Sequence, residues 1–321
     1  MSIKIIICGD PHIQNSNLDE SQRLLDFIIS TAQEREINSI LFSGDLLHQH
    51  SVIRGQVLNF WHDNFEKLSK LSFQTYVTYG NHDYFNQKVP SMGGSLDKIN
   101  YPGVYIVKEP SSIGNIALMP YYHDREKFVM DCNSLCNDIL NPAKTIICHQ
   151  NFTQSLFGDM INPEEIVAKN IIAGHVHSHH LSSGKVFYVG TPKWDSATDA
   201  GEEKGIWIFD FSDDGDVISK EFISTRKVVT PIDKLYFNEG DEEPVLDPSA
   251  RNYLEIKGQS AWINKMKKKY KGLANIKAVY TDRITKVKTE NNLDFTSFIG
   301  SFKPIEGVSN LEIEDYLKEI A

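Results

Sequence analysis

Short apolar runs alternate with longer amphipathic stretches through the first half of the chain. The runs are rich in Ile, Val, Phe and Tyr, which predicts buried strands at residues 3–8, 39–43, 73–79, 145–148 and 170–173. Between the first three runs, apolar residues recur at helical spacing, first at Leu24, Leu25, Ile28 and Ile29, then at Val57, Phe60, Trp61, Phe65 and Leu68. This alternation predicts an α/β fold with a central sheet covered on both faces.

A cluster centred on histidine or aspartate follows each predicted strand. The clusters are Gly9-Asp10-Pro11-His12, Gly44-Asp45-Leu46-Leu47-His48, Gly80-Asn81-His82-Asp83, Cys148-His149-Gln150 and Gly174-His175-Val176-His177. Because loops gather at one edge of such a sheet, we expect the clusters to meet there. Their carboxylate, amide and imidazole groups are ligands for two divalent metals, with one carboxylate to spare as a bridge. A lone Asp-x-His would be an ordinary loop, but five clusters in order predict a dinuclear metal site.

These motifs resemble those of the calcineurin-like metallophosphoesterases. They are most similar to the SbcD-type nuclease subunit of double-strand-break repair and phage recombination. Two further stretches carry the resemblance: His48 directly follows the Asp45 motif, and Gly190-Thr191-Pro192 precedes Gly201-Glu202-Glu203-Lys204-Gly205. The similarity covers residues 1 to about 211. It implies a two-sheet α/β sandwich flanked by helices, with a small α+β cap domain and a short C-terminal helical pair.

The resemblance also implies how the metal ligands divide. It assigns Asp10, His12 and His177 to one ion, Asn81, His149 and His175 to the other, and Asp45 to a bridge between them. A mixed imidazole, carboxylate and amide set suits manganese better than magnesium, which prefers oxygen ligands and keeps its waters. Zinc and iron remain alternatives.

Two metals about 3.5–4 Å apart would activate a water for in-line attack on phosphorus, without a covalent enzyme intermediate. The resemblance implies that His82 protonates the leaving oxygen and that His48 assists at the phosphate. We expect Asp83 either to orient the His82 ring or to cap the following loop. Tyr121 and Tyr122 are expected either in the core or near DNA. The remaining histidines, at positions 50, 62, 123, 179 and 180, are expected to be solvated or packed.

Charge is distributed unevenly along the chain. The formal net charge of −10 argues against nucleic-acid binding, but residues 251–290 hold eleven Lys and Arg against three Asp and Glu, a local +8, which leaves −18 for the rest. Within this segment the candidate DNA contacts are Lys265, Lys267, Lys268, Lys269 and Lys271. They surround Trp262 and Tyr270, which favours contact with phosphates and stacking on an exposed base; a solvated helix face is the alternative. The acidic residues 238–248 are expected to form a linker or surface loop leading into this segment.

The C-terminal residues show helical spacing twice. The two apolar sets are Phe295, Phe298, Ile299 and Phe302, then Ile313, Tyr316, Leu317 and Ile320. Helices this short need a docking partner. The resemblance implies the base of the coiled coil of an SbcC-like ATPase, and docking on the chain's own basic segment is the alternative. We therefore expect a metallophosphoesterase nuclease domain at 1–228, a basic cap or DNA-binding domain at 229–290, and a helix-loop-helix at 291–321, a candidate ATPase-binding segment.

The composition is typical of a cytoplasmic enzyme. No apolar run approaches 18 residues, no signal peptide is recognisable, and the four cysteines lack zinc-like spacing, so neither a membrane span nor disulfides are expected.

Together these features predict a manganese-dependent DNA nuclease subunit, exonuclease on ends and endonuclease on single strands. It would work in recombination and repair as a homodimer within a heterotetramer that contains the SbcC-like ATPase. The alternative is a small-molecule phosphodiesterase or phosphatase of the same superfamily. A non-catalytic scaffold is disfavoured, because every expected ligand position is filled.

Overall fold

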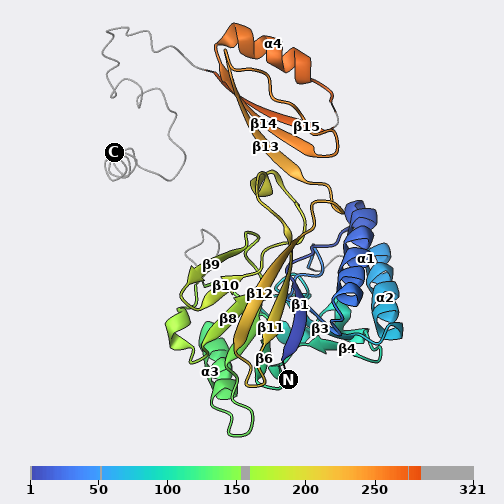
Figure 1. The fold of residues 1–321 in the computed structure, drawn as a ribbon, viewed down its shortest axis with the longest axis vertical. Coiled ribbons are helices and arrows are strands. Elements are labelled where there is room, and N and C mark those ends of the chain that lie inside the picture. The colour runs from blue at the N-terminus through green and yellow to red at the C-terminus, as the bar shows by residue number, and fades with distance from the viewer. Residues whose placement is uncertain (1, 51–52, 153–159, 274, 283–321) are drawn as a thin grey trace, which may run out of the picture.

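The computed structural model describes residues 2–50, 53–152, 160–273 and 275–282. Within them, two six-stranded sheets form the body of the molecule, and a three-stranded sheet forms a smaller unit (Figure 1). The first sheet contains β1 Ile3–Cys8, β2 Ser39–Phe42, β3 Gln74–Thr78, β4 Val104–Val107, β11 Gly205–Phe211 and β12 Val217–Ser224. The second contains β5 Ser111–Ile113, β6 Ile116–Met119, β7 Thr145–Cys148, β8 Asn170–Ala173, β9 His180–Ser183 and β10 Val186–Tyr188. The spatial orders are β12-β11-β1-β2-β3-β4 and β5-β6-β7-β8-β10-β9.

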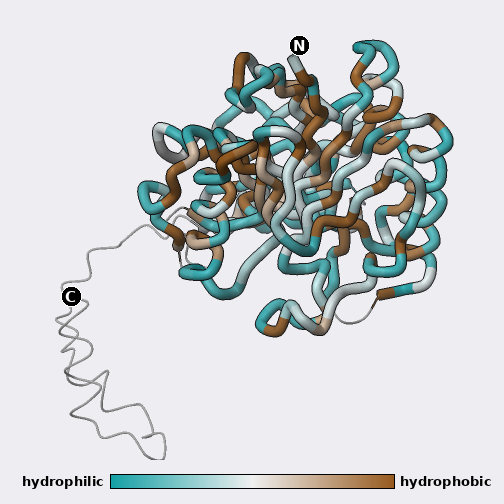
Figure 2. Tube along the Cα trace, turned by 90° about the horizontal axis from the view of Figure 1, so that it is seen from below, coloured by the Kyte–Doolittle hydropathy of each residue, from teal (hydrophilic) through white to brown (hydrophobic). Residues whose placement is uncertain are grey.

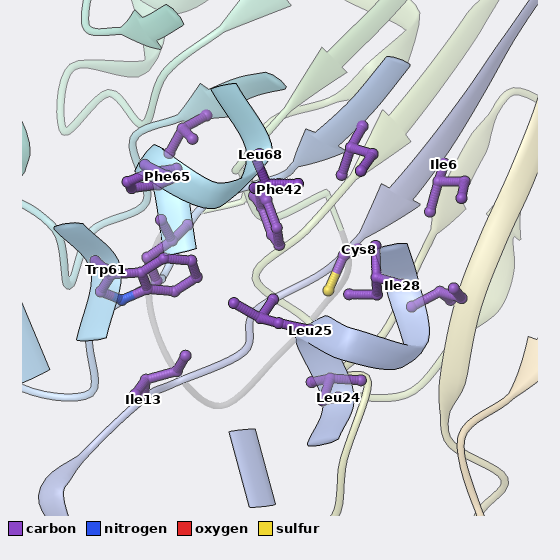
Figure 3. Close-up of a cluster of buried hydrophobic side chains, with 14 of the residues drawn as sticks. Ile6, Cys8, Ile13, Leu24, Leu25, Ile28, Phe42, Trp61, Phe65 and Leu68 are labelled. Atoms are coloured by element: carbon purple, nitrogen blue, oxygen red, sulfur yellow. The ribbon is translucent and has the colours of Figure 1, made fainter. Parts of the chain in front are cut away.

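The alternation of side chains along β1 shows how the layers pack. Ile5 and Ile7 belong to the apolar cluster that fills the space between the two sheets, with Ile147 and Ile172 of the second sheet. Ile6 and Cys8 point the other way, into a cluster with the helices α1 (Leu18–Glu34) and α2 (Gly55–Lys70). Figure 3 shows these helices directing side chains such as Leu25, Ile28, Trp61 and Phe65 at β1 and β2.

Helix α3 (Arg125–Cys136) covers the outer face of the second sheet. The Asp124 carboxylate accepts a hydrogen bond from the Lys127 backbone N–H at 3.0 Å and so caps the helix. Phe128, Cys132 and Cys136 are its buried residues. The body therefore has four layers, helix, sheet, sheet and helix, with hydrophobic stretches through its middle and mostly hydrophilic outer loops (Figure 2).

The smaller unit consists of β13 (Ile232–Asn238), β14 (Arg251–Gly258), α4 (Ser260–Tyr270) and β15 (Ile276–Asp282). Its three strands are parallel, and α4 provides the crossover from β14 to β15. The acidic stretch at 238–248 joins β13 to β14, so it is a surface loop inside this unit and not a linker in front of it. Short 3₁₀ helices complete the description, at Asn15–Asn17, Pro90–Met92, Ser95–Lys98, Pro163–Glu165 and Ala197–Asp199.

All five predicted strands are present, as are both predicted helices, with ends shifted by a residue or so for the strands. The expectation of one central sheet was wrong: β1, β2 and β3 lie in one sheet, and β7 and β8 lie in the other. Each sheet is covered by helices on one face and by the other sheet on the other face. Apolar content predicts that a strand is buried, but it does not say which strands pair.

The predicted C-terminal helix pair lies outside the described residues, and the domain limits at 228 and 290 stay predictions. In the part of the chain that the structure describes, helices long and apolar enough to cross a bilayer are absent.

Candidate metal centre

The candidate ligands lie where strands of both sheets end. Asp10, Asp45 and Asn81 follow β1, β2 and β3, while His149 follows β7 and the His175-His177 pair follows β8. Strands β1–β3 pair in parallel, and so do β7 and β8, so within each sheet these strand ends share an edge. Facing sheets then bring the two sets of loops together.

The first group of ligands contains Asp10, His12 and His177, whose ligand atoms lie within 4.8 Å of one another. The Nε2 atoms of His12 and His177 are 3.2 Å apart. The carboxylate oxygen Oδ2 of Asp45 lies 3.6 Å from Nε2 of His12. This arrangement agrees with the ligand set expected for one metal.

The second group contains Asn81, His149 and His175. Oδ1 of Asn81 lies 3.1 Å from Nε2 of His149 and 3.0 Å from Nδ1 of His175. Oδ2 of Asp45 is 3.3 Å from Nε2 of His149, so the same carboxylate oxygen is close to both groups. Asp45 therefore occupies the position that a bridging carboxylate needs.

The spacing of these atoms fits a pair of divalent cations. Ligands held about 2.1 Å from one ion in octahedral or tetrahedral geometry lie roughly 3.0–3.4 Å apart. The distances within each group, 3.0–3.2 Å, match this range. Oδ1 of Asp10 is buried without a hydrogen-bond partner among the described residues, as expected of an oxygen reserved for a metal. Nδ1 of His149 donates to the Ser43 carbonyl at 2.9 Å, which turns Nε2 toward the centre.

Backbone strain is concentrated at the same residues. His12, Asp45 and His175 have φ values of 43°, 51° and 78°, in the left-handed region that non-glycine residues rarely adopt. Gly44 has φ +101°, and a Cβ there would lie 2.4 Å from Nδ1 of His149. The surrounding packing holds the backbone of these loops in energetically unfavourable conformations. In these conformations the ligand side chains point toward the centre.

The electrostatics of the cluster favour positive charge. Burial raises the pKa of Asp10 to about 6, helped by the neighbouring Asp45 carboxylate. Burial alone would lower the pKa of His149, but Asp45 and Asp10 raise it to about 10. Burial also lowers the pKa of His175 to about 4, together with the charge of His149. Two buried carboxylates thus stabilise positive charge at the centre, on His149 or on a bound cation, while His175 is held neutral.

His82 stands beside the metal ligands rather than among them. Its backbone N–H donates to Oδ1 of Asp45 at 2.8 Å, and its Nδ1 donates to the His48 carbonyl at 2.8 Å. Because a carbonyl only accepts, this bond fixes the tautomer and leaves Nε2 as the nitrogen for proton exchange. The His12 ring lies 5.0 Å from the His82 ring and 5.6 Å from the His48 ring, between centroids.

The contacts of the Asp83 carboxylate differ from both roles expected for it, orienting the His82 ring and capping the following loop. The buried carboxylate accepts from the backbone N–H groups of Leu47 at 3.1 Å and Gly80 at 2.9 Å. It therefore joins the loop that carries Asp45 to the loop that carries Asn81, while the His48 carbonyl orients the His82 ring. The Asp83 carboxylate is buried and needs hydrogen-bond donors, which the two backbone N–H groups provide, whereas the His82 ring bonds the His48 carbonyl.

The sequence analysis did not assign His50 or Tyr121 to the centre, but both lie near it. His50 was expected to be solvated or packed, but its ring stacks on His82 at 4.2 Å and its Nδ1 donates to the Asn81 carbonyl at 2.9 Å. Its spacing of two residues from His48 was the available signal. Tyr121 stacks on His175 with ring centroids 6.3 Å apart, whereas Tyr122 donates to Asp131.

Lys204 is the other residue whose position only the structure shows. It is 1% exposed, and its Nζ contacts the His177 carbonyl at 2.9 Å, Asp199 at 2.9 Å and Glu202 at 2.8 Å. Oδ1 of Asp199 lies 3.9 Å from Nδ1 of His177. A buried ion pair therefore supports the most exposed metal ligand, and the Gly-Glu-Glu-Lys-Gly stretch noted in the sequence supplies its cation.

The five lysines proposed as DNA contacts are all exposed, on α4 and just after it. Lys269 pairs with Glu243 of the acidic loop, and Lys267 lies 5.5 Å from the Tyr280 ring. DNA contact by these lysines stays a prediction, but the packing of the neighbouring aromatic residues disfavours the expected base stacking. Tyr270 is only 5% exposed, and Trp262 packs edge-on against Phe237, because both belong to the apolar face that holds α4 on the sheet.

Residues 3–185 match the family model described as calcineurin-like phosphoesterase. The chain belongs to the calcineurin-like phosphoesterase family. Its two-sheet fold and the clustered metal ligands agree with a phosphoesterase that uses two metal ions. The fold class expected from the sequence is thus confirmed.

Two viral proteins are similar to this chain. "Putative phosphoesterase 244L" of Invertebrate iridescent virus 6 is 26% identical over 223 residues, 65% of this chain and 77% of that protein. "Exonuclease subunit 1" of Enterobacteria phage T4 is 22% identical over 275 residues, 72% of this chain and 78% of that protein. A solved structure described as a novel phosphatase of Mycoplasma pneumoniae has a TM-score of 0.43 and 13% identity, covering 70% of this chain and 93% of that one.

Proposed function

We propose that this phosphoesterase is a metal-dependent DNA nuclease subunit, exonuclease on ends and endonuclease on single strands. The observation that carries the proposal is the position of Asp45 between two ligand groups, with the tautomer-locked His82 beside it. Bound divalent cations offset the negative charge on the phosphoryl oxygens and lower the pKa of the attacking water.

Asp45, His82 and His48 would position the substrate and transfer the proton. Asp45 accepts the His82 backbone N–H, so the ring is held at a fixed position relative to the ligands. Nε2 of His82 then delivers a proton to the leaving sugar oxygen, and Nδ1 stays bonded to the His48 carbonyl throughout. The His48 ring lies 6.4 Å from the His82 ring between centroids, and we assign it to contact with the phosphate.

Two observations favour DNA over a small ester as the substrate. The similarity to the phage exonuclease subunit extends over 72% of this chain, beyond the residues of the family model. The described part of the locally basic segment, residues 251–273 and 275–282, lies in a separate unit, which Figure 1 shows beyond the end of the body toward which β1 runs. A cluster of Lys and Arg in one unit is the electrostatic pattern expected of a nucleic-acid-binding protein.

We further propose manganese as the metal, because the ligands mix imidazole, carboxylate and amide groups. As partners we propose DNA and an SbcC-like coiled-coil ATPase, with two copies of this chain in a heterotetramer in the cytoplasm. Residues 291–321, which would bind the ATPase, lie outside the described residues. Copurification with a large coiled-coil ATPase, lost when these residues are deleted, tests this part.

The nuclease proposal is tested by comparing substrates at equal metal concentration. Purified protein with Mn²⁺ should degrade linear duplex DNA and cut circular single strands, and Mg²⁺ should support less activity. A nitrophenyl phosphodiester and cyclic nucleotides serve as small substrates. Rapid hydrolysis of the small esters without any cleavage of DNA would refute the nuclease proposal and establish a small-molecule phosphodiesterase.

A further inference from the structure

The three-stranded sheet of the smaller unit has two different faces. On one face Phe237, Leu254 and Ile256 pack against Ile263 and Met266 of α4. Successive residues of a strand point to opposite sides, so the alternate positions form the other face. This open sheet face consists of Lys234 and Tyr236 of β13, Arg251, Tyr253, Glu255 and Lys257 of β14, and Lys277, Val279 and Thr281 of β15.

The open sheet face combines aromatic rings with basic side chains. Tyr236 is 61% exposed, and the Lys234 ammonium group lies 5.4 Å from its ring. Lys277 lies opposite Tyr253 in the strand register, with its ammonium group 5.8 Å from that ring. The face carries four basic residues against one acidic residue, 4 − 1 = +3, on a chain of net charge −10.

The order of these residues along the face makes a track. Lys257 pairs with Asn238, Glu255 with Tyr236, and Tyr253 with Lys277. Along the strands, Tyr236 therefore lies at a level between the two exposed lysines, Lys257 and Lys277, and Tyr253 lies at the level of Lys277. Four residues of strand separate the ends of this track, roughly 13 Å at 3.3 Å per residue. That length suits two extended nucleotides.

One end of the track meets the loop that leads to the metal centre. Tyr253 and Lys277 line a cavity of about 360 Å³ together with Asp195, Ser196 and Ala197. Arg251 donates to the backbone carbonyl of Trp194 in the same loop. A few residues further on, Asp199 lies 3.9 Å from the metal ligand His177. The open sheet face is thus continuous with the segment that supports the candidate metal centre.

On the α4 side of the unit, lysines also lie near aromatic rings, but these rings are less exposed than Tyr236: Tyr270 is 5% exposed, and Tyr280, 5.5 Å from Lys267, is only partly exposed. The aromatic residues of α4 face the sheet. Each side has one ion-paired lysine, Lys269 with Glu243 on α4 and Lys234 with Glu255 on the open sheet face. Lysines alone attract phosphates, but they offer nothing on which a base can stack. The structure thus favours the sheet over the helix as the surface for an unpaired strand.

We propose that the open sheet face binds single-stranded nucleic acid, with a base stacked on Tyr236 and phosphates beside Lys257 and Lys277. The inference rests on the proposed nuclease function and gives it a surface that guides the strand toward the metal centre. Exposed aromatic rings provide stacking for any base, and the neighbouring ammonium groups neutralise the backbone.

The test measures binding of a fluorescent oligodeoxythymidylate to the full chain in metal-free buffer, where cleavage does not interfere. Tyr236→Ala should weaken binding about 5- to 150-fold, the range expected for loss of one base stack, while Tyr236→Phe keeps the ring and the affinity. Lys257→Gln combined with Lys277→Gln should flatten the slope of log affinity against log salt by roughly 1.4, which is 0.7 for each contact.

The matched control removes the same charge from the other side of the unit. Lys265→Gln combined with Lys268→Gln on α4 should leave the salt slope at its wild-type value. Thermal unfolding midpoints equal to that of the wild type confirm that each variant is folded. A flattened slope for the α4 pair and an unchanged slope for the sheet pair would overturn the proposal in favour of the helix.

Two other outcomes are distinguishable. If Tyr236→Ala binds the oligonucleotide normally but dissociates a dimer in sedimentation, the face is an interface between copies and the proposal is overturned. If the wild type hydrolyses a nitrophenyl phosphodiester but neither binds nor cuts DNA, the proposed nuclease function itself fails. If the wild type cuts single strands and the variants of the open sheet face bind the oligonucleotide as tightly as the wild type, only the proposed binding surface is refuted.

Discussion

Replacing Lys204 by methionine should both destabilise the protein and weaken its metal site. Methionine keeps most of the side-chain volume but removes the ammonium group, whose partners are Asp199, Glu202 and the His177 carbonyl. Glu202 is 37% exposed and can turn to water, so it contributes little. Asp199 is 3% exposed and would remain as a buried carboxylate without its cation.

Breaking a buried ion pair from one side costs about 3–5 kcal/mol, because the remaining charge stays out of water. At roughly 2–4 °C per kcal/mol for a domain of this size, the melting temperature should fall by roughly 6–20 °C. Asp199 also lies 3.9 Å from Nδ1 of His177, so the ligand loses part of its support. For a residue behind a metal ligand, a drop of about 10–100-fold in metal affinity is expected.

The loss of stability in Lys204→Met should also depend on pH, because it arises from the ionised Asp199 carboxylate. Burial alone would raise the pKa of Asp199, but the charge of Lys204 holds it below its usual value. The pair therefore stabilises the fold above about pH 4, and this contribution is lost as the pH falls through the depressed pKa. The deficit of Lys204→Met should accordingly be full at neutral pH and shrink in acid.

Differential scanning calorimetry with and without chelator, and titration with Mn²⁺, measure the two effects. Lys70→Met is the control, because Lys70 forms an exposed pair with Glu66 and its loss should cost less than about 0.5 kcal/mol. A Lys204→Met protein as stable as the Lys70→Met protein, with unchanged Mn²⁺ affinity, would refute the reasoning.

Three further predictions concern the centre and the core. His82→Ala should abolish phosphodiester cleavage with both metals retained, since its ring bonds the His48 carbonyl; loss of a metal equivalent in elemental analysis would make His82 a ligand instead. Asp45→Asn should lower both metal occupancy and activity, because one carboxylate oxygen serves both ligand groups; full occupancy at micromolar Mn²⁺ would contradict a bridge. Trp61→Ala should lower the free energy of unfolding by about 3–5 kcal/mol in urea titrations, since the fully buried indole stacks on Phe65; an unchanged midpoint would show that the core closes around the gap.

The sequence by itself determined the elements and the chemistry of this protein. Runs such as residues 3–8 are too apolar to lie anywhere but in a buried strand, and their ends carry the metal-binding side chains. Strand ends and ligand types are local properties, so one sequence is enough to read them. The motifs at these strand ends, with the family resemblance they carry, implied Asp10, His12, Asp45, Asn81, His149, His175 and His177 as ligands, and the structure brings these residues together.

Only the tertiary structure decided how these pieces are arranged. Strands β7 and β8 pair in a second sheet. The Lys204–Asp199 ion pair supports His177. The Asp83 carboxylate accepts hydrogen bonds from backbone N–H groups and not from the His82 ring. These contacts join residues distant in the sequence, or depend on which of several partners a group bonds. The sequence shows the lysines of α4. Which aromatic side chains are exposed depends on how the helix packs on its sheet. Such choices follow from long-range packing and from the cost of unpaired buried groups, which periodicity does not encode.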